Sequence, residues 1–590
     1  MCGIITIVEN SKNNTKSANI GEMLFSLSKR GPDEKGSINI ENTTLGQTRL
    51  SVVDINGGHQ PMRDNSKQLT IVFNGEIYDY KELTKTLKEK GHIFSTNSDT
   101  EVILKAYIEY GIDCPKYLDG MFAFAIWDDE KKELFIARDR FGKKPFYYTW
   151  INDMFLGSSE IKALFASGLV KGKVDPIAID NYLQLSYIPP WKTVYSNIHT
   201  LQPAHACIVK NGKIKNWQYW QLKNNPSEIS YEEAKKIIKD LLNNAVKKRT
   251  VADVEIGSLL SGGVDSTIIT AYTQKYTKQQ VKTFSVGYEG YINELPFAKQ
   301  ASEKIGTEHY TLQTKSELIN ELEKVVDYLD EPHADSSNLS QYLISGLASS
   351  KVKVVMSGDG ADELFMGYGW YWKYWNTNKL IRLKNFFFSN QFKEYLKHTA
   401  IFSKKDRLNL LIDKSLLSDD IEKKCTNKNT WLNRTKQINI FDLTTYLPGQ
   451  LLVKIDRMSM VHGLEVRSPF LDYKLAEFVY NLPTEFKMNK NGGKIILKDI
   501  LLEIMPKEFV YRRKQGFGAP VKEWLQTESV KSFIKKTLSE DTQLYKFLKK
   551  EEVLNIFDTS YKKNDDKAQY KLWSIFCLAL WFKHHQKYHE

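Results

Sequence analysis

Short apolar runs separated by turn residues fill the first part of the chain, up to about residue 205. Their length and their β-branched or aromatic content are typical of strands in antiparallel sheets. Two helices are expected, at about 18–29 and 100–110, and Ser98-Asp99 stands before the second as an N-cap, followed by Glu101. The clearest strand-like runs lie at 69–73, 120–127, 133–138, 144–148 and 154–158.

From residue 231 the pattern changes to apolar strands alternating with helices, which indicates a parallel sheet. Residues 221–230 are polar, so we expect domains at 1–205 and 231–590 joined by a linker over 206–230. After about residue 445 the pattern is mostly helical. Strands are expected at 255–260, 283–286 and 352–356, and helices at 231–249, 295–305 and 341–349.

Length and composition narrow the class of protein. A chain of 590 residues is too long for one core, and 42% apolar content argues against disorder. The five cysteines include no CxxC pair, so neither a disulfide framework nor a zinc site is indicated, and a cytoplasmic location without a signal peptide is expected. The longest apolar run, near 574–582, falls short of the roughly 20 residues that span a membrane and predicts a buried helix.

The net charge of +12 has more than one interpretation, and an anionic nucleotide substrate is compatible with it. Nucleic-acid binding is one, and the basic, aromatic segment 370–435 could stack on bases. The commoner explanation for the charge is that lysines are scattered over solvated faces. For the aromatic residues of the segment, it is that they form the faces of core-facing helices. No RNA- or DNA-binding motif accompanies the charge, so no nucleic-acid partner is expected.

Cys2 is the first candidate for chemistry. A small second residue normally allows Met1 to be removed, which would leave Cys2 with both a thiol and a free α-amine. An unperturbed amine titrates near ~8 and a thiol near ~8.5, so the amine can take the thiol proton and activate the nucleophile. The alternative is an incidental cysteine at a frayed end, against which the apolar run at 4–8 argues.

Two glycine-containing loops follow predicted strands. Ser261-Gly262-Gly263-Val264-Asp265-Ser266 lies between a strand and a helix, where a tight turn and the free N–H groups of a helix start suit a phosphate. The run from Ser357 to Glu363, Ser-Gly-Asp-Gly-Ala-Asp-Glu, follows the third strand. Because ligands bind at the carboxyl ends of parallel strands, both loops are expected at one nucleotide.

The first loop resembles the PP-loop of enzymes that cleave ATP to AMP and pyrophosphate, and the whole chain resembles the glutamine-hydrolysing asparagine synthetase family. The resemblance implies an N-terminal Ntn-hydrolase αββα sandwich and a C-terminal PP-loop (adenine nucleotide alpha-hydrolase-like) parallel α/β sheet with helical additions. The matching segments are 2–4, 30–33, 49–51, 74–78, 98–99, 261–266, 357–363, 456–457, 465–472 and 514–518.

For the first domain the resemblance implies a glutaminase. Cys2 would be its nucleophile, and Arg49 would pair with the glutamine α-carboxylate, beside the backbone of Leu50, Ser51, Val52 and Val53. Glu76 and Asp99 would hold the α-ammonium group, while Asn74 and the Gly75 N–H would form the oxyanion hole.

For the second domain the resemblance implies ATP, with Mg²⁺ near Asp265 and Asp362. Lys494 would stabilise charge at an adenylate, Asp456 would lie beside the acceptor, and Asp359 would deprotonate the attacking ammonia. The other expected ATP contacts are Leu260, Ser261, Gly262, Gly263, Ser266, Val286, Ser357 and Gly358.

Two features depart from the family pattern: Asp359 replaces a glutamate, and segment 370–435 looks like an insertion. Aspartate is the expected acceptor, alongside glutamine and ATP as substrates. The alternative keeps both half-reactions but amidates a uronic acid of surface polysaccharide or a natural-product precursor. A catalytically dead nucleotide sensor and a tRNA-modifying PP-loop enzyme are less favoured, because the glutamine pocket motifs are intact. No membrane partner is expected, and a homodimer is left open.

Overall fold

The computed structural model describes the chain except residues 11–16, 227, 290–293, 315–318, 376–394, 397–398, 427–433, 513–517, 541–542 and 563–565. Most of the predicted motif 514–518 and part of segment 370–435 therefore lie outside the described residues. Residues 370–372 are described: Tyr371 is buried, and Trp370 stacks on Tyr368 and donates to Asp442 over 3.0 Å. Trp372 is exposed, so this short part is only partly core-facing.

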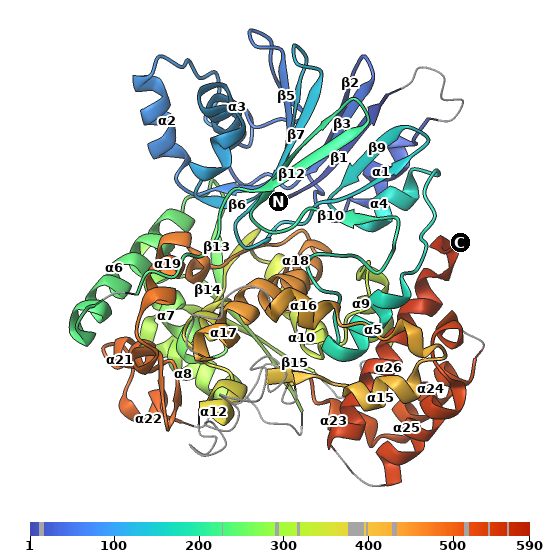
Figure 1. The fold of residues 1–590 in the computed structure, drawn as a ribbon. Coiled ribbons are helices and arrows are strands. Elements are labelled where there is room, and N and C mark those ends of the chain that lie inside the picture. The colour runs from blue at the N-terminus through green and yellow to red at the C-terminus, as the bar shows by residue number, and fades with distance from the viewer. Residues whose placement is uncertain are drawn as a thin grey trace.

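Two six-stranded antiparallel sheets form the upper part of the molecule (Figure 1). The first has the order β10-β8-β9-β1-β3-β2 and the second β12-β11-β7-β6-β5-β4. Their strands are β1 Cys2–Glu9, β2 Glu34–Ile40, β3 Thr43–Arg49, β4 Met62–Asp64, β5 Leu69–Ile77, β6 Gly120–Asp128, β7 Glu133–Arg138, β8 Tyr147–Ile151, β9 Met154–Ser158, β10 His199–Thr200, β11 His205–Lys210 and β12 Lys213–Gln218.

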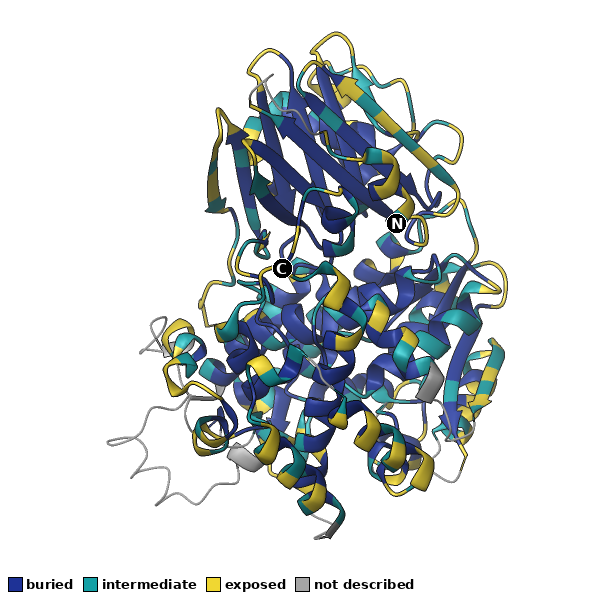
Figure 2. Cartoon of the chain, turned by 90° about the vertical axis from the view of Figure 1, so that its right-hand side faces the viewer, coloured by how far each residue is buried: buried dark blue, intermediate teal, exposed yellow. Residues whose placement is uncertain are grey.

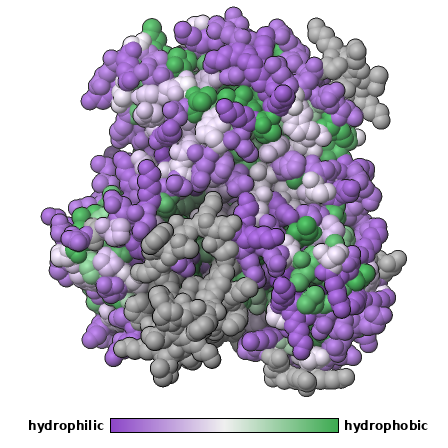
Figure 3. Space-filling model, in the orientation of Figure 1, coloured by the Kyte–Doolittle hydropathy of each residue, from purple (hydrophilic) through white to green (hydrophobic). Residues whose placement is uncertain are grey.

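One pair of helices covers each sheet, giving the predicted αββα sandwich. Helices α1 (Ile20–Ser26) and α4 (Ile161–Ala166) pack on the first sheet, and α2 (Tyr80–Glu89) and α3 (Asp99–Tyr110) lie beside the second. The predicted N-cap is confirmed, because Ser98 accepts the Thr100 N–H over 3.2 Å. Helix α2 was not predicted, because only three of its residues, Tyr80, Leu83 and Leu87, are buried and most of the others are charged or polar. Most residues in the facing sheets are buried (Figure 2), whereas hydrophilic residues cover most of the coloured face in Figure 3.

The lower part contains a parallel five-stranded sheet with the order β15-β14-β13-β16-β17. The three predicted strands are present, and β15 and β17 were missed: β15 is polar and partly exposed, and β17 is three residues long with two charged side chains. From β13 the chain passes to β14 on one side and later to β16 on the other, which makes a switch point between β13 and β16. The strands are β13 Ile256–Leu259, β14 Lys282–Tyr288, β15 Glu308–Thr314, β16 Val354–Met356 and β17 Glu465–Arg467.

Helices surround this sheet and continue to the end of the chain, as the pattern after residue 445 predicted. The expected buried helix is present within α26, and no described helix is long and apolar enough to cross a membrane. The helices are α6 Tyr231–Arg249, α7 Val264–Tyr276, α8 Leu295–Ile305, α9 Ile319–Tyr328, α10 Ser337–Ser349, α11 Ala361–Leu364, α12 Gly369–Trp375, α15 Lys404–Leu410, α16 Asp420–Thr426, α17 Arg434–Phe441, α18 Leu452–Met460, α19 Tyr473–Asn481, α20 Thr484–Lys487, α21 Ile495–Leu501, α22 Lys507–Val510, α23 Val521–Leu525, α24 Glu528–Ser539, α25 Lys550–Lys562 and α26 Asp566–His585.

Segments of the chain cross between the two parts and pack against the opposite part. Residues 206–218, expected in a linker, lie almost entirely in the strands β11 and β12 of the second sheet. Helix α5 (Pro176–Leu185) packs against α15, and the Tyr182 hydroxyl donates to the Ser574 carbonyl over 2.7 Å. At the other end, Gly172 donates to the Tyr588 carbonyl over 2.8 Å and accepts from the Glu590 N–H over 3.1 Å.

Candidate active sites

A small cavity of about 30 Å³ lies where β1, β3 and β5 meet the lower sheet, and we call it the N-terminal cavity. Strand pairing positions it, because Cys2 on β1 lies opposite Arg49 on β3. Its lining includes eight residues that the sequence predicted, although Ser51 and Asn74 are not among the lining residues. The lining residues are Met1, Cys2, Arg49, Leu50, Val52, Val53, Gly58, Gln60, Phe73, Gly75, Glu76, Ser98, Asp99, Thr100 and Glu465.

Cys2 and Asn74 are in direct contact. The Cys2 N–H donates to Asn74 Oδ1 over 3.0 Å, and Asn74 Nδ2 is buried without a hydrogen-bond partner among the described residues. The side-chain amide therefore has a donor that no described residue uses, and an oxyanion hole requires such a donor. Burial raises the pKa of the Cys2 thiol, and the nearby amino terminus and Arg49 oppose that shift.

Met1 lies inside the N-terminal cavity and is buried. Its carbonyl accepts the Leu50 N–H over 2.9 Å, and its amino group lies 3.3 Å from Glu465 Oε2. The Cys2 nitrogen is an amide while Met1 is attached. Removing Met1 would therefore free the α-amine and also vacate part of the cavity.

Charged side chains also line the cavity. The Arg49 guanidinium pairs with Glu34 and donates to the carbonyls of Val53 and Asp54 over 3.2 and 2.8 Å, which fixes its plane. Burial raises the pKa of Asp99 to about 6 and that of Glu76 well above its usual range. Two buried carboxylates on one wall favour a cationic ligand group there.

The second site, which we call the loop site, lies at the switch point of the parallel sheet. The loop from Ser261 to Ser266 joins β13 to α7, and the loop from Ser357 follows β16. Ser261 Oγ lies 3.1 Å from Ser266 Oγ and accepts the Gly263 N–H over 3.3 Å, which closes the turn. No side chain caps the start of α7, so its N–H groups are available to an anion.

Lys494 brings the two loops together. Its Nζ forms ion pairs with Asp265 Oδ2 and, over 2.7 Å, with Asp362 Oδ1. A Cβ on Gly367 would lie 2.2 Å from Lys494 Cε, and one on Gly358 would lie 2.9 Å from Asp265 Cβ, so both close approaches depend on glycine. Asp265 Oδ1 is buried without a hydrogen-bond partner among the described residues.

These two carboxylates suit Mg²⁺, which is often held by one or two protein carboxylates together with water and substrate phosphates. No group of three or more potential metal-ligating side chains occurs in the described part of the chain, so a cage made by the protein alone is not found there. Asp265 and Asp362 fit a cation that arrives with a nucleotide.

Asp359 lies at the start of the second loop and faces the same site. It accepts a hydrogen bond from the Ser357 hydroxyl, and burial raises its pKa. The positive charge of Lys454 on α18, a residue that the sequence did not single out, opposes this rise in the pKa. Lys454 donates to Ser337 Oγ over 2.7 Å and lies 3.3 Å from Asp335 Oδ2, so it connects α10 with the loop site.

The remaining predicted nucleotide contacts lie along the sheet edge. Leu260 directly follows β13, is buried, and donates its N–H to the Phe284 carbonyl over 2.9 Å. Val286 lies on the neighbouring strand β14.

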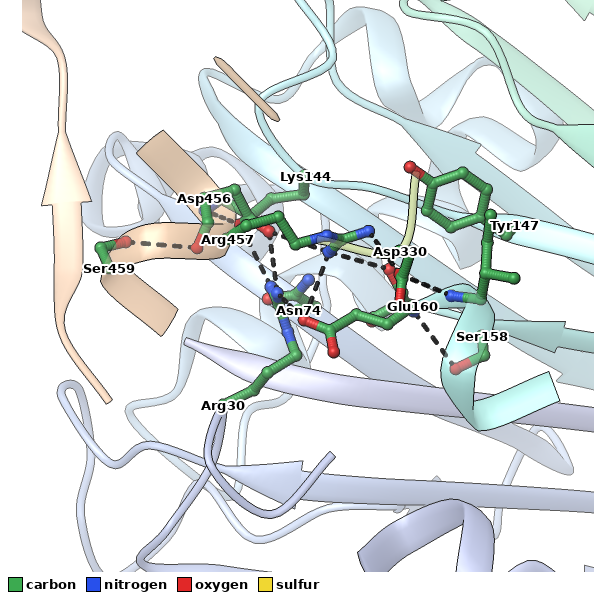
Figure 4. Close-up of polar contacts among 12 residues, drawn as sticks. Arg30, Asn74, Lys144, Tyr147, Ser158, Glu160, Asp330, Asp456, Arg457 and Ser459 are labelled. Carbon is green, nitrogen blue, oxygen red and sulfur yellow. Dashed lines mark hydrogen bonds and ion pairs between the residues drawn. The ribbon is translucent and has the colours of Figure 1, made fainter. Parts of the chain in front are cut away.

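Asp456 is placed differently from the other predicted residues. It lies in a buried cluster of ions between the two parts of the molecule (Figure 4). Its carboxylate pairs with Arg30 over 2.8 and 3.1 Å and with Lys144 over 3.1 Å, and these cations hold its pKa far below the usual range. Its ion pairs are therefore with the interface rather than with the loop site.

Sequence reasoning also missed Gln60 and Glu465 in the N-terminal cavity. Gln60 accepts the Phe73 N–H over 2.7 Å and donates to Thr100 over 3.0 Å, so it holds β5 against α3. Glu465 belongs to a matching motif but had no role assigned. Glu465 and Arg467 alternate with Leu464 and Val466, which is a strand signal, but such alternation predicts an exposed face for the two charges and gives no sign of their burial.

Comparison with known proteins agrees with this architecture. The family model described as asparagine synthase matches residues 237–583, and that described as glutamine amidotransferase domain matches residues 1–220. Similar curated proteins include glutamine-hydrolysing asparagine synthetases 3 and 1 of Bacillus subtilis (strain 168). The first is 33% identical over 93% of this chain and 94% of its own length, and the second is 29% identical over 98% and 96%. A Gallus gallus asparagine synthetase is 30% identical over 83% of this chain and 80% of its own length.

Proposed function

This chain belongs to the asparagine synthase family, and we propose that it is a glutamine-hydrolysing ligase that converts aspartate to asparagine with ATP. The reaction consumes ATP, L-aspartate, L-glutamine and water, and it yields AMP, pyrophosphate, L-asparagine and L-glutamate. The observation that carries the proposal is the presence of two chemically distinct sites in one chain. A cavity lined by the Cys2 thiol, Arg49, Glu76 and Asp99 lies mainly in the N-terminal domain, and a strand-end site with Asp265, Asp362 and Lys494 lies in the C-terminal domain.

The glutaminase half-reaction would begin after removal of Met1. The α-amine of Cys2 takes the thiol proton, and Sγ attacks the carboxamide carbon of glutamine. Asn74 Nδ2 and the Gly75 N–H donate to the oxyanion, while Arg49 binds the α-carboxylate and Glu76 and Asp99 bind the α-ammonium group. The protonated α-amine passes this proton to the amide nitrogen, which leaves as ammonia, and water then hydrolyses the thioester to glutamate and the free thiol.

The synthetase half-reaction would take place at the loop site. The β-carboxylate of aspartate attacks the α-phosphorus of ATP, giving β-aspartyl adenylate and pyrophosphate. Lys494 stabilises negative charge at the adenylate, and Asp265 and Asp362 would hold Mg²⁺, which neutralises phosphate charge when bound. Ammonia then attacks the acyl carbon, Asp359 takes its proton, and AMP leaves.

An acceptor screen tests the identity of the substrate. Pyrophosphate release with ATP and ammonia is measured for aspartate and for other carboxylates, including a uronic acid. We expect aspartate to give the highest kcat/KM. Higher kcat/KM with another carboxylate would keep both half-reactions and reject asparagine as the product.

A further inference from the structure

Strand β17 of the C-terminal sheet extends to the N-terminal cavity. Glu465 and Arg467 lie two residues apart on this strand, so their side chains leave the same face. Glu465 lines the cavity, and its Oε1 accepts from Arg467 Nε over 2.7 Å. Arg467 Nη2 lies 3.3 Å from Glu76 Oε2, and the Arg467 side chain is fully buried.

The Arg467 guanidinium is anchored by its own domain. Its Nη1 donates to the carbonyls of Arg249 and Val251, each over 2.7 Å, at the end of helix α6. Nη2 has no hydrogen-bond partner among the described residues and is the end that faces Glu76. The position of this cation beside the cavity is therefore set by the C-terminal domain.

The backbone of the same residue supports the loop site. Arg467 pairs with Met356 across the parallel strands β16 and β17. Its carbonyl accepts the Ser357 N–H over 2.9 Å, at the first residue of the loop that carries Asp359 and Asp362. A single residue thus contacts both candidate sites, through its side chain on one side and its main chain on the other.

Glu76 needs a cation to stay charged. Asp99 and Glu465 are the like charges that act on it, and the amino terminus and Arg467 are the opposite ones. The phenols of Tyr78 and Tyr80 also interact electrostatically with Glu76. Burial raises the pKa of Glu76, and Arg467 is the strongest group that opposes it. A neutral Glu76 would lose its attraction for an ammonium group.

We propose that Arg467 is a positioning residue for glutamine, which fixes the Glu76 carboxylate so that the C-terminal domain completes the glutamine pocket. The proposal rests on the proposed function of the N-terminal cavity. It also gives a physical path between the sites: a shift of β17 that follows from events at the Ser357 loop would move the cation that holds Glu76.

Glutamate release in the absence of ATP and acceptor tests the inference directly. For Arg467→Gln we expect the KM for glutamine to rise at least about tenfold, with a smaller change in kcat, as the loss of a charge-assisted contact predicts. Arg467→Lys keeps the charge and should recover part of the affinity.

The pH profile separates this role from a purely structural one. Glu76 must be ionised to bind an ammonium group, and its ionised fraction falls as the pH drops through its pKa. Without Arg467 that pKa rises further, so the acidic limb of kcat/KM for glutamine should move to higher pH. Within a Glu76→Gln background, Arg467→Gln should add little to the KM.

Lys248→Gln is the matched control. It removes another ion pair between the domains, in which Lys248 Nζ lies 2.9 Å from Asp119 Oδ2. We expect its KM for glutamine to stay within about twofold of the wild-type value. If the wild-type protein releases no glutamate from glutamine, the proposed function fails. If it does, and Arg467→Gln leaves both KM and pH profile unchanged, the inference alone fails. Should Arg467→Gln not fold, the same two measurements on Arg467→Lys decide, and an unchanged KM and profile overturn the inference.

Discussion

The two candidate sites are assembled in opposite ways. The N-terminal cavity draws residues from β1, β3, β5, α3 and β17, which are far apart in sequence and belong to both domains. The loop site draws most of its residues from two contiguous loops at the ends of adjacent parallel strands, with Lys494 added from before α21. A mutation in the loop from Ser261 to Ser266 should therefore act on one site, whereas the cavity should respond to changes in both domains.

The polar groups of the two sites also differ in the partners that hold them. In the cavity, Arg49 and Asp99 are already held by backbone partners, so the binding wall is formed before any ligand arrives. In the loop site, one lysine holds two carboxylates together, and Asp265 Oδ1 has no hydrogen-bond partner among the described residues. We infer that the cavity is preorganised and that the loop site is completed by its substrate.

The largest expected effect separates the sites completely. Cys2→Ala should abolish glutamine-dependent amide formation, because no other group can form the thioester, and it should leave ammonia-dependent formation intact. Parallel assays with the two nitrogen donors measure this. Equal loss of both activities would contradict the separation of the two sites, since it would mean that they are not chemically independent.

Asp265→Asn should produce the reverse pattern. We expect pyrophosphate release to slow, with its activation free energy raised by several kcal/mol, because a carboxylate that fits a phosphate-bound cation is removed. Glutamate release without ATP should stay near the wild-type rate. Wild-type pyrophosphate release by the variant would contradict the assignment of Asp265.

Asp359→Asn should separate the two reaction steps of the loop site, adenylation and amide formation. Exchange of pyrophosphate into ATP, dependent on the acceptor, should persist, while amide formation should fall about 10²- to 10⁴-fold through loss of the base. Loss of both would favour a role in metal binding or in folding of the loop. Asp359→Glu is the companion variant, and near-wild-type turnover would show that the shorter carboxylate does not set the acceptor preference.

Asn74→Ala should have the smallest effect of the four. Loss of one oxyanion donor costs about 10²- to 10³-fold in kcat. The decrease should appear in glutaminase turnover and be absent from ammonia-dependent synthesis. A decrease mainly in the affinity for glutamine would instead assign Asn74 to substrate binding.

Sequence reasoning succeeded where the signal was local. The loop from Ser261 to Ser266 lies between strand and helix as predicted, and the start of α3 at Ser98 follows from capping chemistry. It failed for β17, whose charged residues look solvent-exposed in isolation and are buried only because they pair with each other and with Glu76. Asp456 is a similar case: its cations, Arg30 and Lys144, lie more than 300 positions away in the chain, and no local pattern reveals such a pairing.

The contacts between the domains bear on how ammonia could travel. Arg30 of the N-terminal domain pairs with Asp456 of α18, and residues 588–590 are held by Gly172 of the N-terminal half. Separating the domains would have to break this buried ion pair and this backbone bridge at the same time. Rigid-body opening during turnover is therefore disfavoured, and a small neutral molecule passing from one domain to the other would be shielded from protonation by bulk water.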